Sequence, residues 1–412
     1  MGDAAEAEVR KLIQRQGKIT FAQFMETALF SPRGGYYTSG TARPGRDYYT
    51  APATHPIFGA LIALQLEQLW QVMDYPSPFH VVEVGAGTGA LGLDILAYTS
   101  QLSSGFGQAL EYVAVDYNPQ QHGSGRLHAT RAFGLPFRDL VGCILSNELL
   151  DSFPVHRFAI EGDRIREVYV TLGETLELVE TLDEPSTARI QERLSGLELD
   201  LPEGFRGEVN LALEGWAAEV SRSLKRGVVL TFDYGHLATD LYSYQRSQGT
   251  LRCYYEHTLG SNPYLWPGQQ DITAHVDFTS LASWGEEHGL TTAGFTSQRE
   301  FLYNLGFPWL LASLNERPLS QRERDANRMA MLELVKPGEM GDFKVLAQSR
   351  RLPSGTPLHG FSLGSPLRQD LQNRKALLDI PLLSKDHMGL MAARYPHLTW
   401  DWEALWPPER EP

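Results

Sequence analysis

Hydrophobic residues recur every three or four positions in the first part of the chain, which is the spacing of one helix face. This spacing predicts helices over residues 4–30 and 57–73, with Thr20 as a cap at the start of a second helical piece within the first range. The stretch between them, residues 31–56, is rich in glycine, proline and tyrosine, and we expect a long loop there. Long loops in compact proteins commonly carry a function.

The pattern changes near residue 80, where hydrophobic residues begin to form short continuous runs. Runs at residues 80–84, 111–116, 141–146 and 228–232 predict four strands, and a glycine-rich turn and a helix over about residues 90–98 follow the first. Strands separated by helices or long connections favour a parallel sheet with helices on both faces. We therefore expect an α/β fold.

Other patterns cover the second half of the chain. Alternating apolar and polar positions over residues 155–180 predict a small antiparallel insertion, and residues 186–225 are expected to be mainly helical. Residues 234–275 contain many turn residues and no strong pattern. Residues 291–295 and 343–348 are expected to close the sheet as antiparallel strands.

These elements divide the chain into five expected segments. The last one is rich in proline and glycine and contains three tryptophans, and we expect it to pack back on the body. The segments are an N-terminal helical and lid region (1–75), the first half of the sheet with the glycine turn (76–154), an inserted strand and helix subdomain (155–225), the second half of the sheet (226–350) and a C-terminal extension (351–412).

Composition and charge exclude several classes of protein. With 42% hydrophobic and 21% charged residues among 412, the chain is not largely disordered. Only two cysteines, Cys143 and Cys253, are present, which excludes a disulfide framework. A net charge of −14 and the lack of a basic run argue against nucleic acid as the main partner. We find no targeting pattern at the start and no membrane-spanning stretch, so we expect a cytoplasmic protein with reduced cysteines.

The turn after the first strand has the sequence Glu83-Val-Gly-Ala-Gly-Thr-Gly-Ala. Such turns bring backbone N–H groups and a helix N-terminus close to an anion, either a pyrophosphate or the carboxylate of S-adenosylmethionine (SAM). The position of Glu83 and the spacing of Gly85, Gly87 and Gly89 favour SAM, and Asp116 would bind ribose hydroxyls in either cofactor. A nicotinamide or flavin site and a turn without a ligand are the alternatives.

Polar residues also follow two later strands. Asn147, Glu148 and Asp151 come after the third, and Asp233 and Tyr234 after the fourth. The carboxyl ends of parallel strands form the ligand crevice of open α/β sheets. Glu148 and Asp151 could bind a guanidinium through paired hydrogen bonds and accept its proton. Alternatively, Asp151 or Ser152 caps a helix and Glu148 is solvated, and Asp233 is a solvated turn residue.

One further cluster has a spacing that could suit a metal ion. It contains Asp271, His275 and Asp277. No second histidine cluster supports it, so we expect no metal site.

In this order, the motifs resemble those of the MidA-type SAM-dependent methyltransferases. This family includes bacterial proteins and a mitochondrial arginine methyltransferase that assists the assembly of respiratory complex I. The glycine turn alone is weak evidence, whereas the ordered series is specific. The matching pieces are Ile19-Thr-Phe-x-x-Phe-Met, Gly35-Tyr-Tyr, Asp47-Tyr-Tyr-Thr-Ala-Pro with Phe58-Gly59, the glycine turn, Asn147-Glu-Leu-Leu-Asp-Ser-Phe-Pro-Val-His, Asp233-Tyr-Gly, Gly249-Thr-Leu-Arg, Asp271-Ile-Thr-Ala-His-Val-Asp-Phe and residues 298–306.

The resemblance implies a class I methyltransferase fold, with a Rossmann-like sheet, an N-terminal helical and lid region and an inserted α+β subdomain. It implies SAM as cofactor and a lid that includes Tyr49 and Thr50. The residues that it places around SAM are Glu83, Gly85, Gly87, Gly89, Asp116 and Asn147. The candidate catalytic residues are Glu148, Asp151, Asp233 and Tyr234.

The resemblance suggests a protein arginine as the methyl acceptor, by analogy with the mitochondrial relative. A methyltransferase for a small metabolite is the first alternative, and a SAM-binding assembly factor without turnover is the second. A homodimer is one assembly compatible with the sequence.

Overall fold

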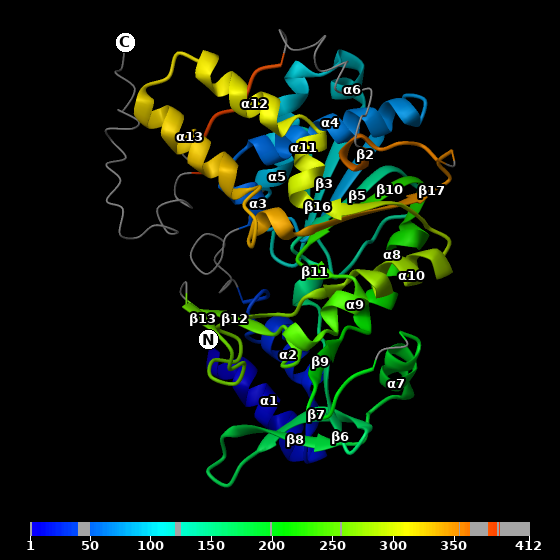
Figure 1. Cartoon of the computed structure of the whole chain (residues 1–412), viewed down its shortest axis with the longest axis vertical. Coiled ribbons are helices and arrows are strands. Elements are labelled where there is room, and N and C mark those ends of the chain that lie inside the picture. Colours follow the sequence, from blue (N-terminus) through cyan, green and yellow to red (C-terminus); the bar gives the residue numbers. More distant parts are fainter. Residues whose placement is uncertain are drawn as a thin grey trace.

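Two β-sheets organise the protein, whose structure is a computed structural model. Within the described residues, a seven-stranded sheet with its helices forms the upper part of Figure 1, and a five-stranded sheet with the N-terminal helices forms the lower part. The described residues are 2–39, 50–119, 125–197, 200–255, 258–353, 355–362, 378–384 and 387.

The large sheet confirms the predicted α/β architecture. Neighbouring strands from β10 to β4 are parallel, and β17 runs antiparallel between β10 and β16. All six strands predicted for this sheet are present, whereas β4 was not predicted because this edge strand is only partly buried. In order across the sheet, the strands are β16 (Thr291–Ser297), β17 (Lys344–Arg350), β10 (Leu224–Asp233), β5 (Leu140–Asn147), β2 (Phe79–Val84), β3 (Leu110–Asp116) and β4 (Leu127–Arg131).

Helices cover both faces of this sheet, and a separate hydrophobic cluster lies under each layer. The first layer consists of α4 (Ile57–Val72), α5 (Ala90–Tyr98), α6 (Ser104–Ala109), α11 (Gln298–Asn304) and α12 (Phe307–Ser313), with α13 (Gln321–Glu333) nearby. The second consists of α8 (Ala212–Ser223) and α10 (Phe278–Glu287). The predicted helices over 57–73 and 90–98 are confirmed. None of the helices in the described ranges is long and apolar enough to cross a membrane.

The five-stranded sheet joins the N-terminal region to the predicted insertion. Strand β7 pairs with β6, β8 and β1, so residues far apart in sequence share one sheet. The antiparallel insertion is confirmed, while β9 interrupts a stretch predicted to be mainly helical. That prediction was wrong there because pairing with β6, a tertiary contact, determines the conformation. The strands are β1 (Ile19–Thr20), β6 (His156–Glu161), β7 (Arg164–Leu172), β8 (Leu178–Asp183) and β9 (Arg206–Val209), and α7 (Ala188–Ser195) precedes β9.

Two helices, α1 (Gly2–Gln16) and α2 (Phe21–Phe30), flank β1. Thr20 caps α2 as predicted, because its side chain accepts a hydrogen bond from the Gln23 N–H and the Gln23 side chain accepts one from the Thr20 N–H. The reciprocal bonds satisfy two backbone donors at the helix start.

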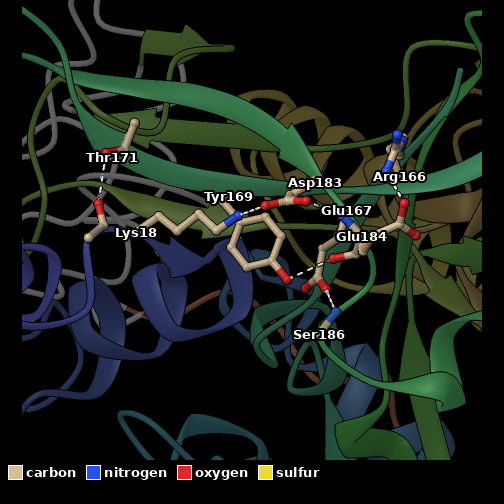
Figure 2. A network of polar contacts seen from close by, with 9 residues as sticks. Lys18, Arg166, Glu167, Tyr169, Thr171, Asp183, Glu184 and Ser186 are labelled. Atoms are coloured by element: carbon tan, nitrogen blue, oxygen red, sulfur yellow. Dashed lines mark hydrogen bonds and ion pairs between the residues drawn. The ribbon is translucent and has the colours of Figure 1, made fainter.

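Figure 2 shows the polar contacts that attach this N-terminal region to the insertion. The Lys18 ammonium pairs with Asp183 of β8 and lies 4.2 Å from the centre of the Tyr169 ring. The Thr171 hydroxyl donates to the Gly17 carbonyl at 2.9 Å. The Lys18 ammonium thus contacts both a carboxylate and the face of an aromatic ring. These contacts hold the loop between α1 and β1 against the sheet.

Two stretches predicted to lack regular structure contain short elements. Helix α3 (Ala51–Thr54) lies within the predicted loop 31–56, of which residues 40–49 are outside the described residues. Residues 234–275 contain strands too short to produce a sequence pattern. They are β11 (Gly235–His236), which pairs with β15 (Val276–Asp277), and the sheet of β13 (Thr258–Gly260), β12 (Arg252–Tyr255) and β14 (Asp271–Thr273), with α9 (Ala238–Leu241) after β11.

The end of α3 is tied to α13 and to the C-terminal extension through two buried side chains. His55 Nδ1 accepts from the Ile57 N–H at 3.0 Å, so Nε2 carries the proton and donates to Asn327 Oδ1 at 3.1 Å. Burial lowers the pKa of His55 to about 3, in agreement with a neutral ring. Asn327 Oδ1 also accepts from the Leu383 N–H at 2.9 Å. The extension packs on the body as predicted, in its described part.

We expect Asn327→Ala to lower the free energy of unfolding by about 1–3 kcal/mol, because buried donors lose their acceptor. Urea denaturation measures this loss. Gln321→Ala on the same helix is the control, since Gln321 is exposed and bonds only to Asp325 among the described residues. Equal stability of the two variants would contradict the bridging role.

Candidate functional site

The glycine turn connects β2 to α5 at the carboxyl edge of the large sheet. All three of its glycines have positive φ angles, 75° at Gly85, 52° at Gly87 and 74° at Gly89, which other residues rarely adopt. A Cβ on Gly85 would lie 2.8 Å from Leu149 Cδ1, whereas one on Gly87 would meet nothing within 4 Å. Packing therefore explains Gly85, while the open space at Gly87 fits a turn that a ligand approaches closely.

Asp116 lies at the end of the neighbouring strand β3 and contacts this turn directly. One carboxylate oxygen accepts from the Gly87 N–H at 2.9 Å, and the other accepts from the Asn118 N–H at 2.8 Å. The residues predicted to bind the methionine carboxylate and the ribose thus meet at one edge. Each oxygen retains a lone pair for a ligand hydroxyl.

Glu83 is buried in the sheet one strand away. Its carboxylate accepts from the Tyr112 hydroxyl at 2.8 Å, and burial raises its pKa to about 8. The tyrosine is a partner that the sequence did not indicate. The predicted contact of Glu83 with the cofactor stays a prediction.

Asn147 ends β5 with its side chain 8% exposed. Its amide nitrogen donates to Glu148 Oε1 at 3.0 Å, whereas Asn147 Oδ1 has no hydrogen-bond partner among the described residues. Buried polar atoms are usually satisfied, so an unpaired acceptor at a strand end is evidence for a ligand that donates there.

Of the two predicted lid residues, only Thr50 belongs to the described part of the chain. Thr50 precedes α3 and accepts from the Ala53 N–H through its carbonyl at 3.1 Å. The next residue, Ala51, donates its N–H to Glu148 Oε1 at 3.1 Å, so the start of α3 is bound to the candidate site. Tyr49 lies outside the described residues.

Glu148 adopts a strained backbone. Its φ angle is 49°, a left-handed conformation that a residue with a long side chain seldom adopts. Burial, followed by the charge of Asp151, raises its pKa to about 8. Strain of this kind is frequent at functional sites, where the surrounding structure maintains it. A fully solvated acid, the alternative interpretation, would not have this raised pKa, and Glu148 is half-buried.

Asp151 lies in the short 3₁₀ helix η2 (Leu150–Ser152) and is 4% exposed. Its Oδ1 has no hydrogen-bond partner in the described part of the chain. Burial raises its pKa, and a hydrogen bond with Tyr234 acts in the opposite direction. Asp151 does not cap a regular α-helix, so that alternative has no support in the geometry.

Asp233, at the end of β10, is fully buried and surrounded by backbone donors. Its carboxylate accepts from the N–H groups of Leu149, Leu150 and Tyr234 at 3.2, 2.8 and 2.9 Å. Burial and the charge of Asp151 raise its pKa, and the N–H groups of Leu150 and Tyr234 act against the increase. It is thus not a solvated turn residue. Its oxygens hold the turn that carries Glu148 and Asp151.

Two tyrosines and an acid that were not among the predicted catalytic residues lie near this cluster. Asp271, the first residue of β14, accepts from the Tyr37 hydroxyl at 2.7 Å. Tyr254 of β12 faces Asp271 in the strand register, and burial, followed by the charges of Asp151 and Asp271, raises its pKa to about 12. Nothing in the residue spacing indicates that these groups meet.

The histidine and acids with metal-like spacing have other partners. Asp277 caps α10 and pairs with Arg193 at 2.9 Å, and His275 packs against Tyr234 with ring centres 5.6 Å apart. Within the described ranges, no group of three or more acids, histidines or cysteines could hold a metal ion.

The arrangement brings two kinds of chemistry to one sheet edge. The glycine turn and Asp116 offer N–H donors and a hydroxyl-binding acid. Glu148 and Asp151 follow the strand next to β2 and offer a half-buried and a buried carboxylate that suit a cation. A cofactor and a basic group could therefore be bound side by side.

The chain is similar to known methyltransferases in sequence. The sequence matches the family of S-adenosyl-L-methionine-dependent methyltransferases over residues 61–296, more than half of the chain. The mitochondrial protein arginine methyltransferase NDUFAF7 homolog of Drosophila melanogaster is 27% identical over 375 residues, covering 82% of this chain and 83% of that protein. Protein arginine methyltransferase NDUFAF7 of Homo sapiens is 25% identical over 377 residues, with 83% of each chain covered.

A solved structure agrees with both findings. A Burkholderia thailandensis protein crystallised with bound S-adenosyl-homocysteine is 31% identical, covers 88% of this chain and 95% of its own, and superimposes with a TM-score of 0.77. The ordered motifs, the sheet and the similarity over most of the chain lead to one assignment. The chain belongs to the MidA-type family of S-adenosyl-L-methionine-dependent methyltransferases, with S-adenosyl-L-methionine as its cofactor.

Proposed function

We propose that this methyltransferase transfers the methyl group to arginine side chains of a protein. The observation that carries the proposal is the buried, unpaired Oδ1 of Asp151 beside the strained Glu148. A buried and a half-buried carboxylate, without an ion pair among the described residues, are costly unless a cationic ligand binds them. A guanidinium offers five N–H donors in a planar fork that suits two carboxylates.

The cofactor residues fit SAM. The open space at Gly87 allows close approach of the methionine carboxylate to the turn, and Asp116 remains able to accept from ribose hydroxyls. The unpaired Asn147 Oδ1 is suited to accept from the ammonium or the adenine amino group of the cofactor.

The protein has to contribute little to bond making and bond breaking in this reaction. When bound, SAM supplies an electrophilic methyl group, which the acceptor nitrogen takes up with loss of one proton. Glu148 and Asp151 would orient the guanidinium and receive that proton, because a protonated guanidinium is a poor nucleophile. Asp233 would act through the turn that it holds, as a positioning residue, and Tyr234 through its hydrogen bond to Asp151.

The proposal is tested by incubating the protein with SAM labelled in the methyl group and a cell lysate. We expect label in protein, recovered as methylarginine after acid hydrolysis. Glu148→Gln and Asp151→Asn should each lower the transfer rate by about 10²-fold or more, the effect of removing a positioned proton acceptor. Calorimetry should find SAM affinity within a few-fold of wild type.

Other outcomes of this labelling experiment would contradict the proposed function. Label only in small molecules would support a metabolite methyltransferase, and no transfer by a protein that binds SAM would support the non-catalytic interpretation. Wild-type turnover in both variants would show that the acids do not take part.

The role of the glycine turn is tested by Gly87→Val. We expect loss of SAM binding with retained folding, because the added side chain enters the space that the ligand requires. Gly162→Val in the β6–β7 turn is a matched control, since its φ of 59° and open surroundings impose the same strain far from the turn. If both variants bind SAM equally well in calorimetry, the turn does not hold the cofactor.

The raised pKa of Glu148 should also make the free energy of unfolding depend on pH. The pKa of Glu148 is raised from 4.5 to about 8, so the unfolded chain loses this proton first and stability falls as pH rises between these values. Glu148→Gln keeps an oxygen for the Ala51 N–H and has no charge. Its stability relative to wild type should therefore increase across this window in urea denaturation, and parallel curves would refute the assignment.

A further inference from the structure

A group of basic side chains lies beside the candidate catalytic residues, although the chain as a whole carries a net charge of −14. Two histidine rings of this group have their centres 5.3 Å apart. Strands β11 and β12, which carry two of its members, lie between the large sheet and the five-stranded sheet (Figure 1). The group, here named the basic cluster, consists of His236, Arg246, Arg252, His275 and Lys344.

The backbone brings these residues together from distant parts of the sequence. Pairing of β17 with β10 places Lys344 opposite the last residue of β10, three positions before His236. The His275 N–H donates to the Thr250 hydroxyl at 3.0 Å, and Thr250 lies two residues before Arg252. The basic cluster is therefore a feature of the tertiary structure.

The cations of the basic cluster keep their charge without a carboxylate partner. Arg246, Arg252 and Lys344 each donate to a backbone carbonyl close in sequence, at 2.8, 3.0 and 2.8 Å. None of the ion pairs between described residues involves any of the three. A guanidinium has five N–H donors and an ammonium three, so most of these donors are available to an anion.

The positive charges dominate the electrostatics at His236. Burial, followed by the charges of Arg246 and Lys344, lowers the pKa of His236 to about 4. The nearby acids Asp240 and Asp342 act in the opposite direction, and each acts less strongly than either cation. The region thus disfavours a further positive charge and favours a negative one.

His275 connects the basic cluster to the candidate catalytic residues. Its Nδ1 atom is buried and has no hydrogen-bond partner among the described residues. Burial, followed by the charges of His236 and of the two arginines in the cluster, lowers the pKa of His275 to about 3. The Tyr234 ring packs against the His275 ring with centres 5.6 Å apart, and Tyr234 is hydrogen-bonded to Asp151. Groups that attract an anion therefore adjoin groups that attract a cation.

From this arrangement we propose that the basic cluster binds acidic side chains of the acceptor protein that flank the methylated arginine. The inference rests on the proposed function and deepens it, because it names the kind of acceptor sequence. Glu148 and Asp151 attract the guanidinium, and the basic cluster attracts carboxylates beside it in the acceptor. An arginine among basic neighbours would be repelled, so charge complementarity selects the acceptor segment.

The test uses two fluorescein-labelled peptides, each with a single arginine. The acidic peptide has aspartates on both sides of the arginine, and the neutral peptide has asparagines at the same positions. By fluorescence anisotropy at about 0.1 M salt, we expect wild-type protein to bind the acidic peptide about tenfold more tightly. The preference should largely disappear at about 1 M salt, where the screening length falls from about 10 to about 3 Å.

Variants of the exposed Arg252 locate the effect. Arg252→Gln should lower the preference for the acidic peptide by about two- to fivefold, the contribution of an exposed ion pair. Arg252→Glu should lower it further, because a carboxylate then faces the aspartates. Arg164→Gln is the matched control, since Arg164 is also an exposed strand arginine but lies in β7, and we expect it to keep the wild-type preference.

Other outcomes overturn the inference. Equal affinity of wild-type protein for both peptides, or a preference that persists in Arg252→Glu, would show that the basic cluster does not bind acidic side chains. An equal loss in Arg252→Gln and Arg164→Gln would assign the preference to overall charge. Binding of inorganic phosphate at the cluster, together with equal affinity for the peptides, would make it a site for a small anion.

Failure of the proposed function gives a different result. The same two peptides are incubated with SAM labelled in the methyl group, alongside the lysate. If the acidic peptide binds with the expected preference, but neither a peptide nor a lysate protein yields methylarginine, the proposed function fails. Methylation of both peptides with equal KM would instead support the proposed function and contradict the role of the basic cluster.

Discussion

The buried carboxylate of Asp233 is the contact on which the candidate site depends. It lies at the end of β10 and accepts three backbone N–H bonds, two of them from the turn that follows the adjacent strand β5. A third link joins the same strands, because the Glu148 N–H donates to the Phe232 carbonyl at 2.9 Å. These bonds hold the turn in which Glu148 adopts its left-handed conformation and which leads into the 3₁₀ helix of Asp151. The strained geometry persists because several bonds determine it together.

The candidate site lies beside parts of the chain that are distant in sequence. The turn after β5 carries Glu148 and Asp151, and the small sheet carries Asp271, whose carboxylate accepts from the Tyr37 hydroxyl of the N-terminal region. The contacts in Figure 2 explain how the last part is held, because Lys18 and Thr171 attach the chain before α2 to the five-stranded sheet. The five-stranded sheet therefore holds the N-terminal region whose Tyr37 contacts Asp271.

Stability and function are in conflict at this edge. The carboxyl groups of Glu148 and Asp151, whose pKa values are raised, lower the stability of the folded state at neutral pH, and a fold selected for stability alone would replace them with apolar residues. The buried Oδ1 atoms of Asn147 and Asp151, which lack a hydrogen-bond partner among the described residues, also lower the stability of the folded state. Such costs are typical of sites that bind a charged ligand, because the missing partners come with the ligand.

The sequence by itself determined the parts that depend on local interactions and on the burial of continuous segments. Strands β2, β3, β5 and β10, the helix after the glycine turn and the cap at Thr20 were predicted because periodicity and capping act within a few residues. Tertiary structure alone decided the rest. Strands β4, β9 and β14 are short or half-exposed and form through pairing with distant partners. The buried state of Asp233, the strain at Glu148 and the meeting of Tyr37 with Asp271 across 234 positions arise from packing, which residue spacing does not encode.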